Sequence, residues 1–304
     1  MTFRHSAALL LSAVAIQPAT AAPVPKAAAR PVVEKFLDAA DNGKGDTDIL
    51  HTAPPVDVVR ELARYFEDEN PARRFRALSV AALLGFNSTD TAVRRATAAV
   101  LLDHASGANG GKKHNARYAV DSLVPYRKAD FGPTAGDAVA KLVAEADPNP
   151  NAILLAGLLE VKAATDDLKK LAGQATGAPS FQTVGWTAVA ALARMGDTDM
   201  AKFCVATVEG EKDPVQRDRH LWLLAYTRSD AAKKLLVAYL NSDDRLPGVK
   251  PGDGHKVALT ALTQLAGTVQ DFPVKGSLTH TYTAEQLAAA RKWVKDQKEL
   301  KWKE

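Results

Sequence analysis

Cysteine is almost absent from this sequence, because Cys204 is the only one in 304 residues. A single thiol excludes an internal disulfide, a C-x-x-C redox pair and a C-x-x-C-H haem site. Cys204 shares an apolar stripe with Met200 and Phe203, where a free cysteine packs as a small hydrophobic residue. A nucleophilic thiol needs access and a lowered pKa. The sequence therefore predicts an unreactive core cysteine.

Aromatic residues are also scarce, at 6% of the chain, and alternating runs of Val, Ile, Thr and Tyr are missing. A β-rich fold needs such runs and is excluded. Hydrophobic residues nevertheless make up 46% of the chain, so Ala and Leu must fill the core. Ala-rich packing suits helices that approach closely. The sequence predicts an all-α fold.

Motifs for catalysis and metal binding are missing as well. The chain has no G-x-S-x-G segment, and its seven histidines form neither H-E-x-x-H nor a pair at i, i+4. The loop SGANGGKKH has the wrong glycine spacing for a phosphate loop, and no Ser or Thr follows its lysines. His104 and His114 flank this loop and form the single candidate metal pair, although histidines at helix ends more often bind carbonyls. We predict no catalytic, cofactor-binding or metal-binding residue.

Acidic residues do not form a recognisable site. The loop 41–48, DNGKGDTD, departs from the Asp-x-Asp-x-Asp-Gly spacing of a calcium loop and lacks the closing Glu. Neighbouring carboxylates, such as Asp166 with Asp167 and Asp243 with Asp244, fall at helix starts or in loops. Carboxylates at helix starts interact favourably with the helix dipole, and those in loops are solvated.

The formal net charge is only +4, which gives no general sign of a nucleic-acid partner. One region, 71–104, does concentrate arginines: Arg73, Arg74, Arg76, Arg94 and Arg95. A basic groove on two helices would hold a phosphate backbone. The simpler interpretation is a solvated helix face beside acidic neighbours, and we expect no nucleic-acid partner.

The most informative stretch is Thr183–Asp199, TVGWTAVAALARMGDTD. Its apolar residues form two stripes at helical spacing, one with Val184, Ala188, Ala191, Leu192 and Met195, the other with Trp186, Val189, Ala190 and Ala193. A surface helix has one such stripe, so two stripes predict burial from two sides. Only Thr187 and Arg194 remain for solvent. Gly196 ends the helix, and Asp197 and Thr198 are able to cap the next one.

Helix, tight turn and helix recur along the chain. Asn70–Pro71, Asp147–Pro148 and Asp213–Pro214 each precede an apolar helical pattern, and proline suits the first turn of a helix. The intervals between such starts are roughly one or two times 30–40 residues, which is the range of helical-hairpin repeats.

The segment ALARMGDTD, followed by a second amphipathic helix and then by Asp213–Pro214, resembles a HEAT repeat. The likeness is to the short bacterial kind that also occurs in phycobilisome-lyase-like proteins. It covers residues 55–270 and is clearest at 183–241, while the loops 109–113 and 243–254 depart from it. The resemblance implies about six antiparallel helical hairpins in a curved α-solenoid, an armadillo-type superhelix. HEAT consensus residues serve packing, so no site residue carries over.

Segments of other character flank these repeats. Residues 1–21 have the basic start, apolar run and A-x-A site of a signal peptide. Residues 22–54 are predicted to form a linker and a capping helix, and 271–304 a loop and a second capping helix over 283–300. From Arg291 onward the chain has six Lys or Arg against three acids. A basic end helix of this kind is able to contact an anionic membrane surface.

These patterns favour an exported, periplasmic or secreted, non-enzymatic scaffold that binds a protein or peptide on its concave surface. The alternative is a lyase- or hydrolase-like HEAT enzyme with an active site on that face, which requires a cleft with converging polar groups. A third is a structural protein tethered through its basic C-terminal helix. No transmembrane segment is predicted. Asn87-Ser88-Thr89 fits a glycosylation sequon, which matters only in a host with that machinery.

Overall fold

The computed structural model describes residues 28–40, 47–107, 113–246, 256–277 and 281–303. The predicted signal peptide, residues 1–21, lies outside this part of the chain. Within it, the prediction of an all-α fold is confirmed: the chain forms helices and no named strand, with two isolated bridges, Arg245 to Lys256 and Val269 to Trp302. None of the described helices is long and apolar enough to cross a membrane.

Fifteen α-helices occur in the described residues. They are α1 (Ala29–Ala40), α2 (Pro55–Ala63), α3 (Pro71–Asn87), α4 (Thr91–Gly107), α5 (Lys113–Asp121), α6 (Ala135–Val143), α7 (Pro150–Leu159), α8 (Thr165–Ala172), α9 (Val184–Arg194), α10 (Thr198–Gly210), α11 (Pro214–Arg219), α12 (Leu221–Thr227), α13 (Asp230–Asn241), α14 (Val257–Thr268) and α15 (Ala284–Asp296). Three 3-10 helices join them: η1 (Thr47–Thr52), η3 (Lys128–Asp130) and η4 (Lys162–Ala164).

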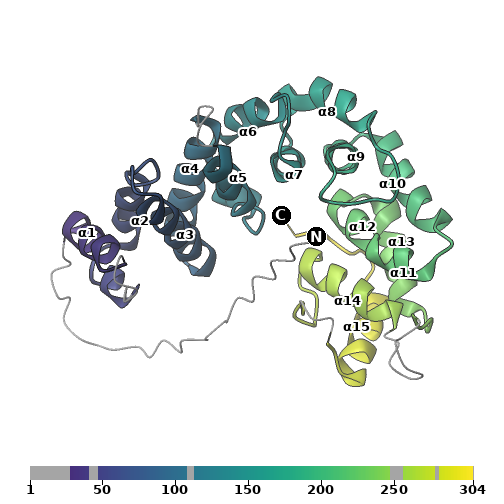
Figure 1. The fold of residues 1–304 in the computed structure, drawn as a ribbon. Coiled ribbons are helices and arrows are strands. Elements are labelled where there is room, and N and C mark those ends of the chain that lie inside the picture. The colour runs from purple at the N-terminus through teal and green to yellow at the C-terminus, as the bar shows by residue number, and fades with distance from the viewer. Residues whose placement is uncertain (1–27, 41–46, 108–112, 247–255, 278–280, 304) are drawn as a thin grey trace, which may run out of the picture.

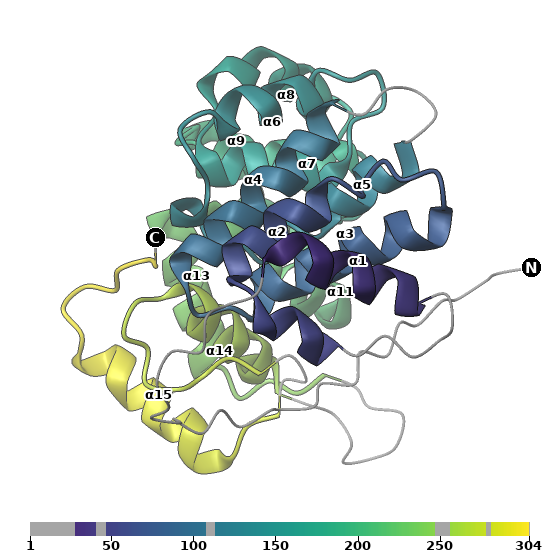
Figure 2. The same ribbon diagram turned by 90° about the vertical axis from the view of Figure 1, so that its left-hand side faces the viewer.

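The helices follow one another along a curve, and each packs against its neighbours (Figure 1). Helices α4, α6, α8 and α10 line the outer side of the curve, and α5, α7, α9 and α12 line the inner side. Seen from the N-terminal end, α1 to α3 lie in front of the later helices, and the C-terminal tail follows one edge (Figure 2). From α4 to α10, helices that alternate along the chain therefore lie on opposite sides of the curve.

Helix α9 joins the two halves of the core. Its residues Ala188, Ala191 and Leu192 belong to the apolar cluster of α1 to α8. Its other face belongs to the cluster formed with α10 to α15, and its members there are Trp186, Val189, Ala190 and Ala193. The prediction of two buried stripes on this helix is confirmed.

The two polar residues assigned to solvent on α9 do not lie there. Thr187 is fully buried, and its hydroxyl donates to the carbonyls of Thr183 and Val184 at 2.9 and 3.0 Å. Arg194 is half-buried, with its guanidinium carbon 4.9 Å from the ring centroid of Tyr226. A threonine satisfies its hydroxyl within its own helix, so polarity did not indicate exposure here.

Two of the three helix starts predicted from Asx-Pro pairs are confirmed. Asn70 caps α3 and Asp213 caps α11, each with its side chain accepting backbone N–H groups and a proline following it. The third start was wrong by two residues. Asn149, not Asp147, caps α7 by accepting from the Asn151 N–H, and Pro150 is the first helical residue.

Three inner helices end in the left-handed conformation at similar intervals. Glu160 follows α7 with φ 55°, Gly196 follows α9 with φ 98°, and Arg228 follows α12 with φ 53°. Glycine adopts this conformation without strain, whereas other residues do so at a cost of about 1–2 kcal/mol. A residue with positive φ therefore follows each of these three helices.

The C-terminal end differs from its prediction. Helix α15 stops at Asp296 instead of Leu300, and the tail returns along α14. The Gln270 N–H donates to the Lys301 carbonyl at 2.8 Å, and the Lys303 N–H donates to the Thr268 carbonyl at 2.7 Å. The basic C-terminal residues therefore do not all lie on one helix.

Candidate partner-binding surface

Helix α3 exposes large apolar side chains in addition to its buried face. Phe75, Leu83 and Phe86 are 47%, 42% and 48% exposed, and their spacing of i, i+8 and i+11 places them on one side of the helix. The core face of α3 is made mostly of small residues, including Ala77, Ala81 and Ala82. The helix therefore directs its bulkiest side chains away from the core.

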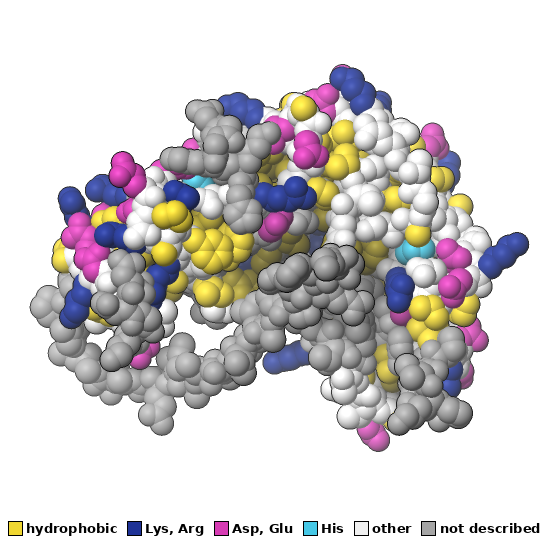
Figure 3. Space-filling model, viewed as in Figure 1, with side chains coloured by type: hydrophobic (Ala, Val, Ile, Leu, Met, Phe, Trp, Pro, Cys, Tyr) yellow, Lys and Arg dark blue, Asp and Glu magenta, His cyan; other side chains and the backbone are white. Residues whose placement is uncertain are grey.

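Residues at and after α5 extend this apolar surface. The ring of Tyr118 lies 5.2 Å from that of Phe75, and Val124, in the turn after α5, is 48% exposed. Figure 3 shows hydrophobic side chains gathered on the inner side of the curve, over α3 and α5. We call Phe75, Leu83, Phe86 and Tyr118 the α3–α5 patch.

A polar contact joins α5 to the next inner helix. Asp121, the last residue of α5, accepts from the side-chain amides of Asn149 and Asn151 through its Oδ1 atom, at 2.9 and 2.8 Å. These bonds hold the start of α7 against the end of α5.

A second group of exposed aromatic side chains lies in the C-terminal half. Phe181, in the loop before α9, is 52% exposed, and its ring meets that of Trp222 edge-on at 6.0 Å. On α10, Phe203 is 45% exposed and stacks on Trp186 at 5.5 Å. Each exposed ring here rests on a more buried tryptophan.

The arginines of α3 do not form a free basic groove. Arg73 pairs with Asp38 at 2.9 Å and with Asp68 at 3.5 Å. Arg74 donates to the Asp68 carbonyl at 2.8 Å, and the guanidinium of Arg76 lies 4.3 Å from the ring centroid of Phe36. These three side chains therefore bind the first helices together.

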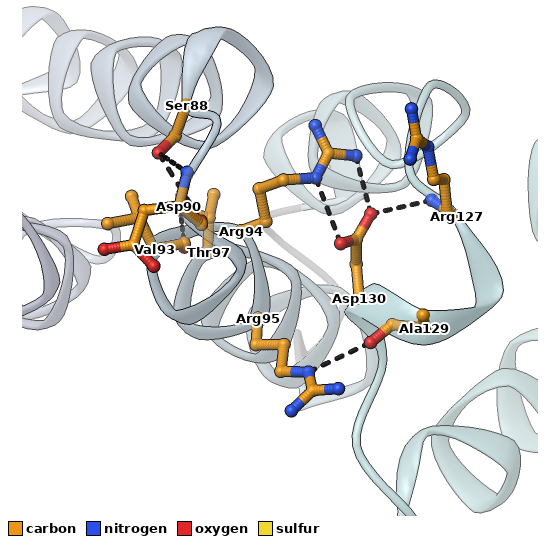
Figure 4. Close-up of polar contacts among 9 residues, drawn as sticks. All are labelled: Ser88, Asp90, Val93, Arg94, Arg95, Thr97, Arg127, Ala129 and Asp130. Atoms are coloured by element: carbon orange, nitrogen blue, oxygen red, sulfur yellow. Dashed lines mark hydrogen bonds and ion pairs between the residues drawn. The ribbon is translucent and has the colours of Figure 1, made fainter.

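The arginines of α4 are also engaged within the chain (Figure 4). Arg94 donates to both carboxylate oxygens of Asp130, at 3.0 and 2.6 Å, and the Arg127 N–H donates to the same carboxylate at 2.8 Å. Burial opposes ionisation of Asp130, but the hydrogen bonds from Arg94 and Arg127 outweigh it and lower its pKa. Arg95 donates to the Ala129 carbonyl at 3.0 Å.

The structure describes the side chain of only one member of the candidate metal pair, His104. His104 has its Nδ1 3.2 Å from a carboxylate oxygen of Glu67 and its ring 5.4 Å from that of Phe66. Burial lowers the pKa of His104. The side chain of His114 lies outside the described part. Within that part, no cluster of three or more potential metal ligands occurs.

The remaining residues singled out from the sequence have structural positions. Cys204 is fully buried, and burial raises the pKa of its thiol to about 12, which suits a packing role. Asp166 and Asp167 stand in the first turn of α8, as predicted. Asp243 binds Arg291 at 3.1 Å instead of being only solvated. Asn87, the first residue of the sequon, is exposed at the end of α3.

The α3–α5 patch was not predicted from the sequence. Its only local signal was a second set of bulky apolar residues on a helix whose core stripe is rich in alanine. That signal does not say whether another helix covers the residues, because the answer depends on packing. No known protein-family model matches this chain, and no curated protein matches it.

Proposed function

We propose that this chain is an exported helical-repeat scaffold of the HEAT type, and that it binds a protein partner on its inner surface. The observation that carries the proposal is the α3–α5 patch. Large, contiguous apolar surface is uncommon on a soluble protein and marks interaction sites. Phenylalanine and tyrosine supply much contact area at such sites.

The repeat character rests on features that recur in successive units. Helices alternate between the outer and inner sides of a curve, and residues with positive φ, Glu160, Gly196 and Arg228, follow three inner helices. Units that lean only on their neighbours produce an extended concave surface. Such a surface suits an amphipathic segment of a partner, whose apolar side would cover Phe75, Leu83 and Phe86.

The partner expected from this surface is a protein segment with apolar anchors, not a nucleic acid. The five arginines of α3 and α4 contact carboxylates, carbonyls or an aromatic ring within the chain. Phosphate binding requires cations that are free to replace counterions. Export, proposed from residues 1–21, places the partner in the periplasm or outside the cell.

The test compares capture of partners from a periplasmic extract by three forms of the chain. We expect the unaltered chain to retain a specific protein that the variant Phe75→Ser, Leu83→Ser, Phe86→Ser loses. The matched control is Phe181→Ser with Phe203→Ser, which removes exposed aromatic residues outside the patch and should retain that protein. Far-UV circular dichroism checks that all three forms are folded. Equal capture by the patch variant would contradict the proposal.

A further inference from the structure

Three cationic side chains bind backbone carbonyls in the region where the C-terminal tail returns to the end of α12. Arg194, at the end of α9, donates through Nη1 to the Tyr226 carbonyl at 3.2 Å. Arg228, directly after α12, donates through Nη1 to the Lys303 carbonyl. The Lys303 ammonium in turn donates to the Ala266 carbonyl at 2.6 Å. We call Arg194, Arg228 and Lys303 the tail cation cluster.

The tail cation cluster makes no ion pair in the described part of the chain, and the acid that favours the charge of Lys303 is Asp271. Each hydrogen bond made by its cationic groups goes to a backbone carbonyl, and none of the three forms an ion pair there. Glu160, the acid that most favours the charge of Arg194, forms its ion pair with Lys128 at 3.0 Å. Partly buried charges are normally paired, because desolvation is costly.

All three cations of the cluster have a lowered pKa, and burial is the largest cause in each case. Burial lowers the pKa of Arg228 to about 10, and the charge of Arg194 acts in the same direction. Burial also lowers the pKa of Lys303, with Arg127 and Arg228 contributing. Arg127 belongs to the turn after α5, and Figures 1 and 2 draw the end of the tail beside that turn. A fourth cation therefore faces the cluster from the N-terminal half.

The position of Arg228 is fixed, and one N–H group of its guanidinium lacks a hydrogen-bond partner among the described residues. Its backbone is left-handed, with φ 53° and ψ 23°, a conformation that a non-glycine residue keeps only when its surroundings enforce it. Its Nε is buried and has no hydrogen-bond partner in the described residues. A planar guanidinium presents its N–H groups in a fork that matches the oxygens of a carboxylate or phosphate.

We propose that the tail cation cluster binds an oxyanion, a carboxylate or phosphate group that neutralises Arg228 together with Arg194 and Lys303. The site is separate from the α3–α5 patch, so it does not depend on partner binding there. Clustered groups with perturbed titration are typical of binding sites. A bound oxyanion would also fasten the C-terminal tail to α12.

The test measures thermal unfolding of the full chain in sodium phosphate, sodium succinate and sodium chloride at matched ionic strength. A ligand that binds only the folded state raises the Tm with its concentration. We expect phosphate, succinate or both to raise the Tm more than chloride does. A response to phosphate alone identifies a phosphate site, and a response to succinate alone identifies a carboxylate site.

Variants separate binding from the general stabilising effect of such salts, which acts on any protein surface. Arg228→Gln should lose the oxyanion-specific rise in Tm, whereas Arg117→Gln, at an exposed position on α5 outside the cluster, should keep it. Because Arg228 also bonds to the tail, Lys303→Gln serves as a second variant that keeps the Lys303 carbonyl, and it should show a reduced response. Equal Tm values in the three salts, or an unchanged response in both cluster variants, would overturn the proposal.

Discussion

Gly157 lies where α7 and α9 approach most closely. A Cβ atom at this position would stand 2.4 Å from the Tyr226 hydroxyl oxygen and 2.8 Å from the Cα of Ala191. The same hydroxyl donates to the Leu154 carbonyl of α7. Glycine is therefore needed here for close contact, since α7 and α9 could not keep this spacing around a larger residue.

We expect Gly157→Ala to lower the free energy of unfolding by about 1–3 kcal/mol, the usual cost of overpacking a core. Urea denaturation measures the change. Gly210→Ala is the matched control, because a Cβ at Gly210 would meet no heavy atom within 4 Å. The control should be neutral, or stabilising by up to about 1 kcal/mol. Equal losses in the two variants would refute the role assigned to Gly157.

Single residues were the least predictable level of this molecule. The burial of Thr187 and the placement of Arg194 over Tyr226 depend on neighbouring helices that the local sequence does not identify. The same holds for the candidate surface, since Phe75 is exposed because no helix among the described residues covers it. The burial of Cys204 was predicted correctly, but the stripe that it was assigned to was wrong for Phe203, which is 45% exposed.

Helix termini, in contrast, are determined by a few adjacent residues. Asp197 caps α10, as predicted. Ser229 caps α13, and Thr283 forms a capping box with Gln286, so these helix starts also depend only on residues within three positions. The failure at α7 has the same local origin. Two Asx-Pro pairs stand in succession at 147–150, and both satisfy the rule that selects a helix start.

We expect Ser229→Ala to destabilise the chain by about 1 kcal/mol, because its hydroxyl accepts the Ala232 N–H at 3.1 Å and alanine leaves that group unsatisfied. Thr134→Ala is the matched control, since Thr134 precedes α6 without a side-chain cap bond. The denaturation midpoint of each variant gives the comparison. Equal destabilisation by Ser229→Ala and Thr134→Ala would contradict the capping role of Ser229.

At the scale of the whole molecule, α9 is the helix that contributes buried residues to both apolar clusters. Its two stripes could be predicted because they repeat within one helix, whereas a curved chain was expected only from the resemblance to HEAT repeats. Curvature depends on the angle between successive helix pairs, and that angle is set by side chains far apart in sequence. The return of the tail from Gln297 to Lys303 could not be predicted either, because it depends on contacts with residues far away in the sequence.

Opposite faces of α9 should therefore report on opposite halves of the molecule. Leu192 is buried in the cluster of α1 to α8, and Trp186 is buried in the cluster of α10 to α15. Truncation to alanine should cost about 2–5 kcal/mol at Leu192 and 3–5 kcal/mol at Trp186. In an array that depends on contacts between neighbours, each loss spreads first into the adjoining units.

Hydrogen exchange read by mass spectrometry distinguishes the two variants. Leu192→Ala should raise exchange mainly in α7 and α8, and Trp186→Ala mainly in α10 and α12, so each variant is the control for the other. The reason is that α9 packs against all four of these helices but buries a different stripe against each pair. A uniform rise along the chain in both variants would show one indivisible folding unit, and the neighbour-dependent architecture would then be wrong.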